Sequence, residues 1–431
     1  MSPSDEPSER ESDFEPTKRD WRSFYSLLLM QTQNSFNDKA VQFLLVCTAA
    51  ALVQMGIEQG GLTEQIPYLL GGLIVTPFIL LSPLAGWIGD RFPKSSIIKF
   101  SAFFQAAVFL ILIGAMFLKS VELLVGCFFL LAIQSSILSP SKLGIIKELV
   151  GKRKLGFASG MLEMCTILGI LGGTIIMSHW YGARLGSAMG PWEALRLPMY
   201  VLLACTPVAI IGALMVQKTE AKRSTPFRAT LLIEHFQQVG SLLKRRELRL
   251  SALGVTYFWI FGGFLQLLSI QVAEEQSGGS STGVGPDIAN MMLVAGVGIA
   301  LGSVLASMIS KRRIELGLVP VGGVIMVVSC VAMAICEPLS FAFMTWMFIS
   351  GIGSAFFLVP VNAYLQDSCE ESERGNILAA NNLLNCIGGI LAVAAQGFMY
   401  KKFGLSVTTQ FILLGVVTLG ATLYALSLIH I

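Results

Sequence analysis

A row of polar side chains follows one face of an otherwise apolar segment near the start of the chain. Its members are Gln31, Asn34, Asp38 and Gln42. Steps of three and four residues place all of them on one face of an α-helix. An ionised aspartate near the centre of a bilayer costs about 2.5–3.5 kcal/mol on insertion scales, so it persists where it meets water, a partner or a ligand. We expect this face to line a polar cavity in which Asp38 binds a cation or an ammonium group, or else pairs with a buried lysine.

Two more charged residues, Lys142 and Glu163, lie inside apolar segments. Lys142 follows the sequence Ser-Pro-Ser, and Glu163 lies about two helical turns into the next segment. Measured from the loop that joins the two segments, Lys142 and Glu163 lie at a similar depth. The two residues could therefore form an ion pair if the segments pack as antiparallel helices. A lysine ammonium also binds phosphate as a point charge. The sequence leaves both interpretations of Lys142 open, an internal ion pair and a phosphate site.

Neutral amides mark the later part of the chain. Asn362 and Gln366 lie in one apolar segment, and Asn381, Asn382 and Asn385 lie in the next. Such amides hydrogen-bond a polar ligand or join neighbouring helices. We select Asn362, Gln366 and Asn382 as candidate binding residues, with the joining of helices as the alternative.

The composition indicates that these residues belong to a membrane protein. Of the 431 residues, 54% are hydrophobic and 13% are charged, whereas an ordinary soluble domain carries about 25% charged residues. A soluble protein this apolar could not cover its surface, and lipid is the solvent that fits. The eight cysteines are scattered, without the spacing of a metal site. We expect no metal, no cofactor and no nucleic-acid partner.

Twelve segments are long and apolar enough to cross a membrane as helices, each of which needs roughly 20 residues. They are 23–52, 65–88, 95–118, 121–147, 156–180, 194–216, 250–273, 287–310, 315–336, 339–366, 375–400 and 405–428. The polar linker 217–249 divides them into halves, 23–216 and 250–431, and the polar tail 1–22 should be disordered. The expected fold class is an all-α membrane protein with two pseudo-symmetric six-helix halves. Weak similarity between 139–149 and 359–368 agrees with such a repeat.

The positive charges predict the orientation of these spans. With the N-terminus inside the cell, Lys and Arg gather in the tail, in the central linker and in the stretches 91–99, 142–154 and 311–313. Few lie in the opposite loops, so the positive-inside rule places both termini in the cytoplasm. The linker also contains an amphipathic stretch, 227–249, which we expect on the cytoplasmic surface of the membrane.

The loop after the second span reads GWIGDRFPK, from Gly86 to Lys94. It resembles the signature loop of the major facilitator superfamily, although a proline replaces the second glycine of that pattern. The resemblance implies that the Asp90 carboxylate meets the positive N-terminus of the helix that starts near Gly375, and so latches one of two alternating conformations. Gly86, Asp90 and Arg91 are the candidate gating residues. The alternative is a tight basic turn.

Longer segments resemble the bacterial lysophospholipid transporter family, a branch of that superfamily. They are NSFNDKAVQFLL (34–45), SPSKLGIIKEL (139–149), ASGMLE (158–163), FFLVPVNAYLQ (356–366) and GNILAANNL (375–383). The resemblance runs through essentially the whole chain. It implies movement of lysophospholipids, such as lysophosphatidylethanolamine, from the outer to the inner leaflet of the inner membrane by alternating access. A cytoplasmic or fused acyltransferase and acyl-carrier-protein synthetase would then restore the missing acyl chain.

The family's charged positions match Asp38, Lys142 and Glu163, and two other positions depart from the family pattern. Lys39 stands where a neutral residue is usual, and Gln266 stands where a basic residue is usual. These changes put the headgroup preference in doubt. Two other functions stay open. One is a proton-coupled antiporter for a drug or another amphiphile, and the other is the membrane part of a bifunctional acyltransferase.

The end of the chain bears on that last alternative. The final residues, Leu426–Ile431, equal the translation of a common sequencing-adapter end, so the native chain is expected to continue past them. No acyltransferase motif of the form His-x4-Asp occurs in this sequence. We therefore expect a transporter and not an enzyme in its own right.

Overall fold

Helices make up nearly all of the structure, a computed structural model that describes residues 15–57, 62–187, 189–219, 231–276, 281–311, 313–370 and 373–426. Within those ranges there is no strand. The helices are α1 (Lys18–Gln54), α2 (Leu62–Arg91), α3 (Lys94–Phe117), α4 (Val121–Gly186), α5 (Pro191–Met215), α6 (Leu231–Lys244), α7 (Arg246–Gln276), α8 (Ser281–Ile309), α9 (Leu318–Ile335), α10 (Phe341–Ser368), α11 (Arg374–Gly397), the π-helical turn η1 (Phe398–Lys402) and α12 (Val407–Leu426).

The first helix begins at Lys18, before the predicted start of the first span at residue 23. A capping box explains the earlier start, because the Thr17 hydroxyl accepts from the Asp20 amide at 3.3 Å while the Asp20 carboxylate accepts from the Thr17 amide at 2.8 Å. The helix therefore extends beyond the apolar stretch that marks the span in the sequence.

The longest helix, α4, contains two spans. Its 66 residues are about three times the roughly 20 that one span needs. Gly151 breaks it, with φ 70° and ψ 173°, a conformation that is open to glycine and strained for other residues. Eleven helices of the described chain are long and apolar enough to cross a membrane, and the break in α4 makes twelve spans. The predicted all-α fold with twelve spans is confirmed.

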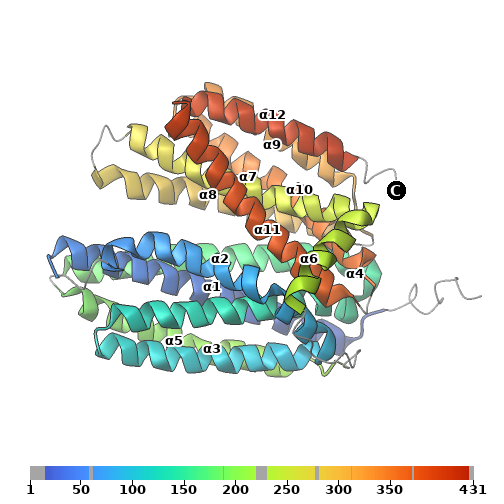
Figure 1. Cartoon of the computed structure of the whole chain (residues 1–431), viewed down its shortest axis with the longest axis horizontal. Helices are drawn as coiled ribbons and strands as arrows, with labels where there is room; N and C mark the ends of the chain where they lie inside the picture. The colour runs from blue at the N-terminus through green and yellow to red at the C-terminus, as the bar shows by residue number, and fades with distance from the viewer. Residues whose placement is uncertain are drawn as a thin grey trace, which may run out of the picture.

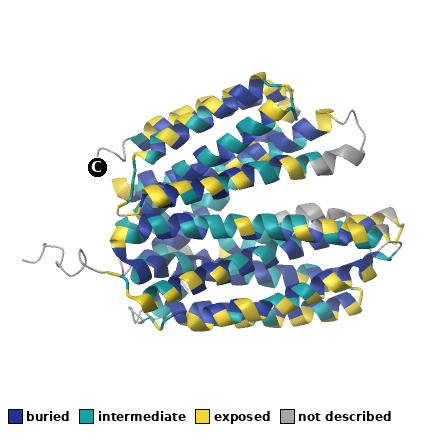
Figure 2. Ribbon diagram, turned by 180° about the vertical axis from the view of Figure 1, so that it is seen from behind, coloured by how far each residue is buried: buried dark blue, intermediate teal, exposed yellow. Residues whose placement is uncertain are grey.

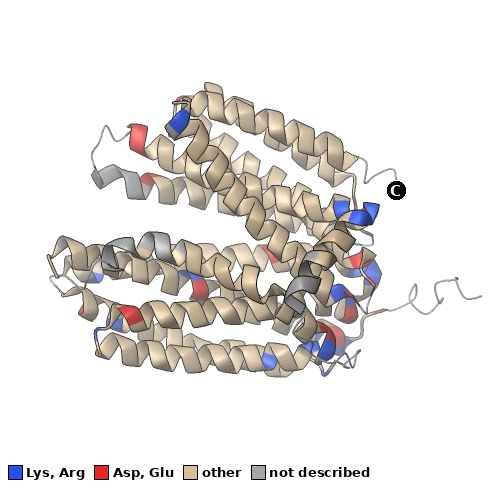
Figure 3. Cartoon of the chain, in the orientation of Figure 1, with Lys and Arg blue, Asp and Glu red and all other residues tan. Residues whose placement is uncertain are grey.

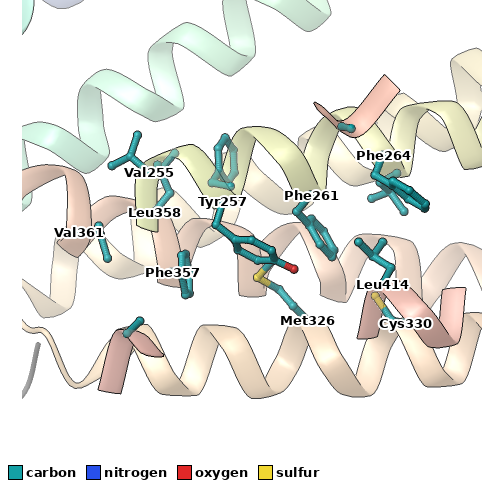
Figure 4. Packing of buried hydrophobic residues seen from close by; sticks show 14 of the residues in the cluster. Val255, Tyr257, Phe261, Phe264, Met326, Cys330, Phe357, Leu358, Val361 and Leu414 are labelled. Atoms are coloured by element: carbon teal, nitrogen blue, oxygen red, sulfur yellow. The ribbon is translucent and has the colours of Figure 1, made fainter. Parts of the chain in front are cut away.

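Two helix bundles lie side by side, α1–α5 in the first half and α7–α12 in the second (Figure 1). The core of the second half contains packed aromatic rings (Figure 4), with the Tyr257 and Phe357 rings edge to face and their centroids 6.0 Å apart. The Tyr257 hydroxyl is buried beside Thr418 at 2.6 Å, which satisfies its polar group inside an apolar core. Two clusters of buried apolar residues form the core of the first half.

The two halves meet at one end of the molecule. We call this the terminal end, because α1 begins there and α12 ends there, and the opposite end the distal end (Figure 1). The ribbons of the two halves lie close together at the terminal end and diverge toward the distal end in both views (Figures 1 and 2). Helix α6 lies at the terminal end and contacts both α2 and α11, one from each half. Its Leu242 is buried in the core of the second half.

The outer surface suits a lipid environment. Charged residues gather at the terminal and distal ends, and the long sides between them carry few charges (Figure 3). Large apolar side chains such as Phe100, Leu110 and Val416 are more than 60% exposed on these sides. Soluble proteins rarely leave such broad apolar surfaces uncovered.

Close packing of α1 against the second span of α4 leads to a stability prediction. A Cβ atom added at Gly173 would overlap the Phe36 carbonyl oxygen and lie 3.1 Å from the Ala40 nitrogen. Overpacking of this kind costs about 1–3 kcal/mol. We expect Gly173→Ala to lower the unfolding temperature of the purified protein in detergent. The matched control is Gly182→Ala in the same helix, where nothing lies within 4 Å, and an equal loss in both variants would contradict the packing argument.

Candidate functional site

The carboxylate of Asp38 lies half-buried within the first half, among side chains of α1 and α4. The Ser135 hydroxyl donates to its Oδ2 atom at 2.6 Å, and the Asn34 amide donates to the same atom at 3.2 Å. The other oxygen, Oδ1, has no hydrogen-bond partner among the described residues. One oxygen is thus held by the protein and the other is not.

Asn34, a predicted binding residue, has both of its polar groups engaged. Its Oδ1 accepts from Gln105 at 3.0 Å and from Gln134 at 3.2 Å, while its Nδ2 faces Asp38. We did not select Gln105, Gln134 or Ser135 from the sequence. The sequence shows only that polar residues occur inside the apolar third and fourth spans. It does not show which neighbouring helix each of these residues faces.

Lys142 lies beside the same face of α1. Its ammonium donates to the Gln31 Oε1 atom at 3.1 Å. The Gln31 Nε2 atom donates in turn to Ser35 at 2.9 Å and to Thr166 at 3.1 Å. No direct ion pair joins Lys142 to Glu163 in the described part of the chain. The direct contact of Lys142 is therefore with Gln31, while its charge also interacts with that of Glu163, and both interpretations of Lys142 stay open.

Four charges gather here, and we call Asp38, Lys39, Lys142 and Glu163 the charged cluster. The charge of Lys142 interacts with those of both Asp38 and Glu163, and the charge of Lys39 interacts with that of Asp38. The Lys39 ammonium donates to the Gln42 side chain at 3.0 Å, so this predicted binding residue also has a protein partner. Because the cluster holds two cations and two anions, it matches a ligand that carries both signs of charge.

The candidate residues of the second half mostly join the halves. Gln366 donates to Ser159 at 3.4 Å, and Asn382 donates to Ser139 at 3.0 Å. Both serines belong to α4 in the first half. Asn362 is half-buried, and it forms no hydrogen bond among the described residues. Interhelical contact, the alternative considered for these amides, therefore describes Gln366 and Asn382 in this conformation.

The signature loop lies against the start of α11. The Gly375 amide donates to Asp90 Oδ1 at 2.9 Å, so the carboxylate meets the positive end of that helix. Glycines allow this approach. A Cβ at Gly375 would overlap the Asp90 carboxylate, and a Cβ at Gly86 would lie 2.8 Å from the Asn376 side-chain oxygen. The contact joins α2 of one half to α11 of the other at the terminal end.

The basic residues of the same loop have other partners. Arg91 lies over the Trp87 ring, with its guanidinium carbon 5.1 Å from the ring centroid. Lys94 forms an ion pair with Glu148 at 2.6 Å, and both side chains are largely buried. These contacts lie within the first half, whereas Gly86 and Asp90 approach α11.

An ion-pair bridge also joins the halves at the terminal end. Lys147 lies 2.9 Å from one Asp367 carboxylate oxygen, and Lys152 lies 3.1 Å from the other. Lys147 also donates to the Asp367 backbone carbonyl, a residue 220 positions along the chain. The bridge thus connects the two segments whose weak similarity suggested an internal repeat.

Small residues bring the second span of α4 close to α8. A Cβ at Gly160 would overlap the Ser307 hydroxyl and lie 2.8 Å from the Ser303 carbonyl oxygen. A Cβ at Gly156 would lie 2.7 Å from Ser310. Closure of the terminal end therefore depends on the absence of side chains at these two glycines.

Comparison with known proteins identifies the family. The sequence model of the Major Facilitator Superfamily matches residues 27–393, with a further match at 279–431. The chain belongs to this superfamily. It is also similar to the lysophospholipid transporter LplT of Photorhabdus laumondii, at 27% identity over 90% of this chain and 91% of that protein. LplT of Pectobacterium carotovorum is 27% identical over 90% of this chain and 88% of its own length.

Solved structures of the superfamily share the fold. FucP in the outward conformation aligns with a TM-score of 0.72 at 12% identity, covering 94% of this chain and 99% of FucP. A bacterial homologue of the iron transporter ferroportin, in an outward-facing state, aligns with a TM-score of 0.66 at 16% identity, covering 96% of this chain and 98% of that chain. At such identities the likeness concerns the fold alone.

Proposed function

We propose that this major facilitator protein moves lysophospholipids, such as lysophosphatidylethanolamine, from the outer to the inner leaflet of a bacterial inner membrane. The observation that carries the proposal is the charged cluster, which lies inside the first half of a chain that is similar to an LplT relative over 90% of its length. A zwitterionic headgroup brings a phosphate and an ammonium, and the cluster offers one partner for each. A drug antiporter would need a carboxylate for proton coupling but has no evident use for Lys142.

The headgroup would bind with its phosphate on Lys142 and its ammonium on Asp38 or Glu163. Lys142 donates to the neutral Gln31 amide and also interacts with the charges of Glu163 and Asp38, so a phosphate can take the place of the Gln31 contact. Glu163 is half-buried within the same cluster. The single acyl chain would stay in lipid, between the two halves, since burying it in a polar cavity would cost hydrophobic free energy.

The positive-inside rule supports a cytoplasmic terminal end, with both chain termini inside the cell. The basic residues Lys94, Lys147, Lys152 and Arg245 lie at this end. In this orientation the two halves contact each other at the cytoplasmic end and diverge toward the outside of the cell, which corresponds to the outward-facing state. Inward movement of a lipid then requires the Asp90–Gly375 contact and the Asp367 bridge to break as the halves rock.

A reacylating enzyme is the proposed partner. A lysophospholipid that reaches the inner leaflet lacks one acyl chain, so an acyltransferase with an acyl-carrier-protein synthetase is the activity that would consume it. Such an enzyme could act in the cytoplasm or be fused beyond the cytoplasmic C-terminal end.

Photolabelling tests the proposed substrate. A lysophosphatidylethanolamine with a photoreactive group on its acyl chain is expected to label the helices that face the seam between the halves, α2, α4, α8 and α11. Excess unlabelled lysophosphatidylethanolamine should remove most of the labelling, while a two-chain phosphatidylethanolamine should not. Labelling that responds to a soluble cationic drug and not to the lysolipid would support the antiporter instead.

A further inference from the structure

A set of polar side chains on α3 and α4 surrounds the Asp38–Asn34 pair and has no place in the proposed headgroup contacts. Ser135 donates directly to Asp38 Oδ2 at 2.6 Å. Gln105 and Gln134 are 0% and 4% exposed, and both donate to Asn34 Oδ1. We call Ser135, Gln105 and Gln134 the support network of Asp38.

The support network fixes which way the Asn34 amide points. Asn34 Oδ1 receives two N–H groups, so only its Nδ2 group is left to face Asp38. A flipped amide would place N–H donors against N–H donors and an oxygen against the carboxylate, and buried polar groups without partners cost about 1–3 kcal/mol each. Two glutamines from two other helices therefore decide that Asn34 is a donor to Asp38.

Both donors reach the same carboxylate oxygen. Ser135 and Asn34 hold Oδ2, while Oδ1 has no hydrogen-bond partner in the described chain. If these polar residues served only to satisfy one another, a buried carboxylate would be expected to have both oxygens occupied. The unequal pattern holds the carboxylate in one orientation and leaves Oδ1, which is buried in this conformation, without a hydrogen-bond partner among the described residues. Preorganised groups of this kind bind with a smaller entropic cost.

We infer that Ser135, Gln105 and Gln134 are positioning residues, which orient the Asp38 carboxylate so that Oδ1 receives the ammonium group of the substrate. The inference rests on the proposed function, since it needs Asp38 to bind a cationic headgroup. The other charges of the cluster, on Lys39, Lys142 and Glu163, face the same region and are left in place by the test variants.

A double-mutant cycle tests the inference, with uptake of labelled lysophosphatidylethanolamine into the inner leaflet of proteoliposomes as the assay. Ser135→Ala removes one hydrogen bond to a charged group and is expected to raise KM about tenfold with a smaller change in the maximal rate. Ser135→Thr keeps the hydroxyl and should restore most of the affinity. Gln105→Leu should act in the same direction as Ser135→Ala.

The decisive comparison repeats Ser135→Ala and Gln105→Leu in an Asp38→Asn background. Residues that act through the Asp38 carboxylate should have almost no further effect there, whereas residues with a purely structural role should have the same effect in both backgrounds. Ser136→Ala is the matched control, because the neighbouring Ser136 hydroxyl donates to the Pro77 carbonyl at 3.2 Å. It should leave KM unchanged.

Each outcome has a distinct meaning. Equal effects of Ser135→Ala in both backgrounds, or no rescue by Ser135→Thr, would overturn the positioning role and leave the proposed substrate intact. A folded Asp38→Asn protein that transports with wild-type KM would instead overturn the assignment of Asp38, and the support network would lose its purpose with it.

Discussion

Asp38→Asn is expected to slow the inward movement of lysophosphatidylethanolamine by about ten- to a hundredfold. The substitution keeps the size and a hydrogen-bonding oxygen but removes the negative charge that faces the ammonium. Hydrogen bonds to charged groups contribute about 1.5–3 kcal/mol, and each 1.4 kcal/mol is a factor of ten. Lys142→Gln removes the partner of the phosphate and should have an effect of similar size. Initial rates over a range of substrate concentrations measure both variants.

A matched control separates charge at the site from charge elsewhere. Asp287 is a half-buried acid on α8, outside the charged cluster. Asp287→Asn should transport at the wild-type rate. If it lost as much activity as Asp38→Asn, the effect would belong to the overall charge of the protein and not to the cluster.

Gly160→Leu is expected to keep the terminal end open. The new side chain would occupy the space now filled by Ser307 and by the Ser303 carbonyl of α8, so the halves could not approach as they do here. Interiors tolerate little overpacking, and relief by separation of the halves costs less than deformation of two helix backbones. The variant should fold, favour the inward-facing state and transport slowly, because the outward-facing state is needed to load substrate.

Cys369 reports on this change. It follows α10 at the terminal end, is 3% exposed, and lies near the charges of Arg374 and Lys147. Burial raises the pKa of the Cys369 thiol to about 12, so little reactive thiolate is present at neutral pH. Maleimide labelling of Cys369, followed by peptide mass spectrometry, should be slow in the wild type and at least about tenfold faster in Gly160→Leu.

The comparison variant for this measurement is Gly182→Leu, on the distal part of the same helix. Nothing lies within 4 Å of a Cβ at that position. Labelling of Cys369 should stay slow in this variant. Fast labelling in both variants, or slow labelling in both, would contradict the role assigned to Gly160 in closure.

The spans could be predicted from the sequence because the bilayer sets their length. Each apolar run of roughly 20 residues corresponds to a helix or, in α4, to half of one. The shortness of the connection between the two spans of α4 could not be foreseen, because the helical geometry is interrupted only at Gly151 and resumes directly after it. The early start of α1 depends on a capping box in the polar tail, outside any apolar pattern.

The site could be predicted only in part, because periodicity gives the face of one helix and not its neighbours. The face that carries Gln31, Asn34 and Asp38 was visible in the spacing, and the structure places it beside Lys142. Depth along two helices suggested a pair between Lys142 and Glu163, but depth does not fix rotation about each axis, and Lys142 donates to Gln31 instead. The partners of Asn34 lie on other helices, so only the fold reveals them.

The most direct test of the proposed function is leaflet movement itself. Purified wild-type protein is placed in proteoliposomes, labelled lysophosphatidylethanolamine is added to the outer leaflet, and the fraction protected from extraction by albumin is followed over time. The proposal predicts protection well above that of protein-free vesicles, and a strong reduction of this protection in Asp38→Asn. A folded wild-type protein that gives no more protection than empty vesicles would contradict lysophospholipid transport.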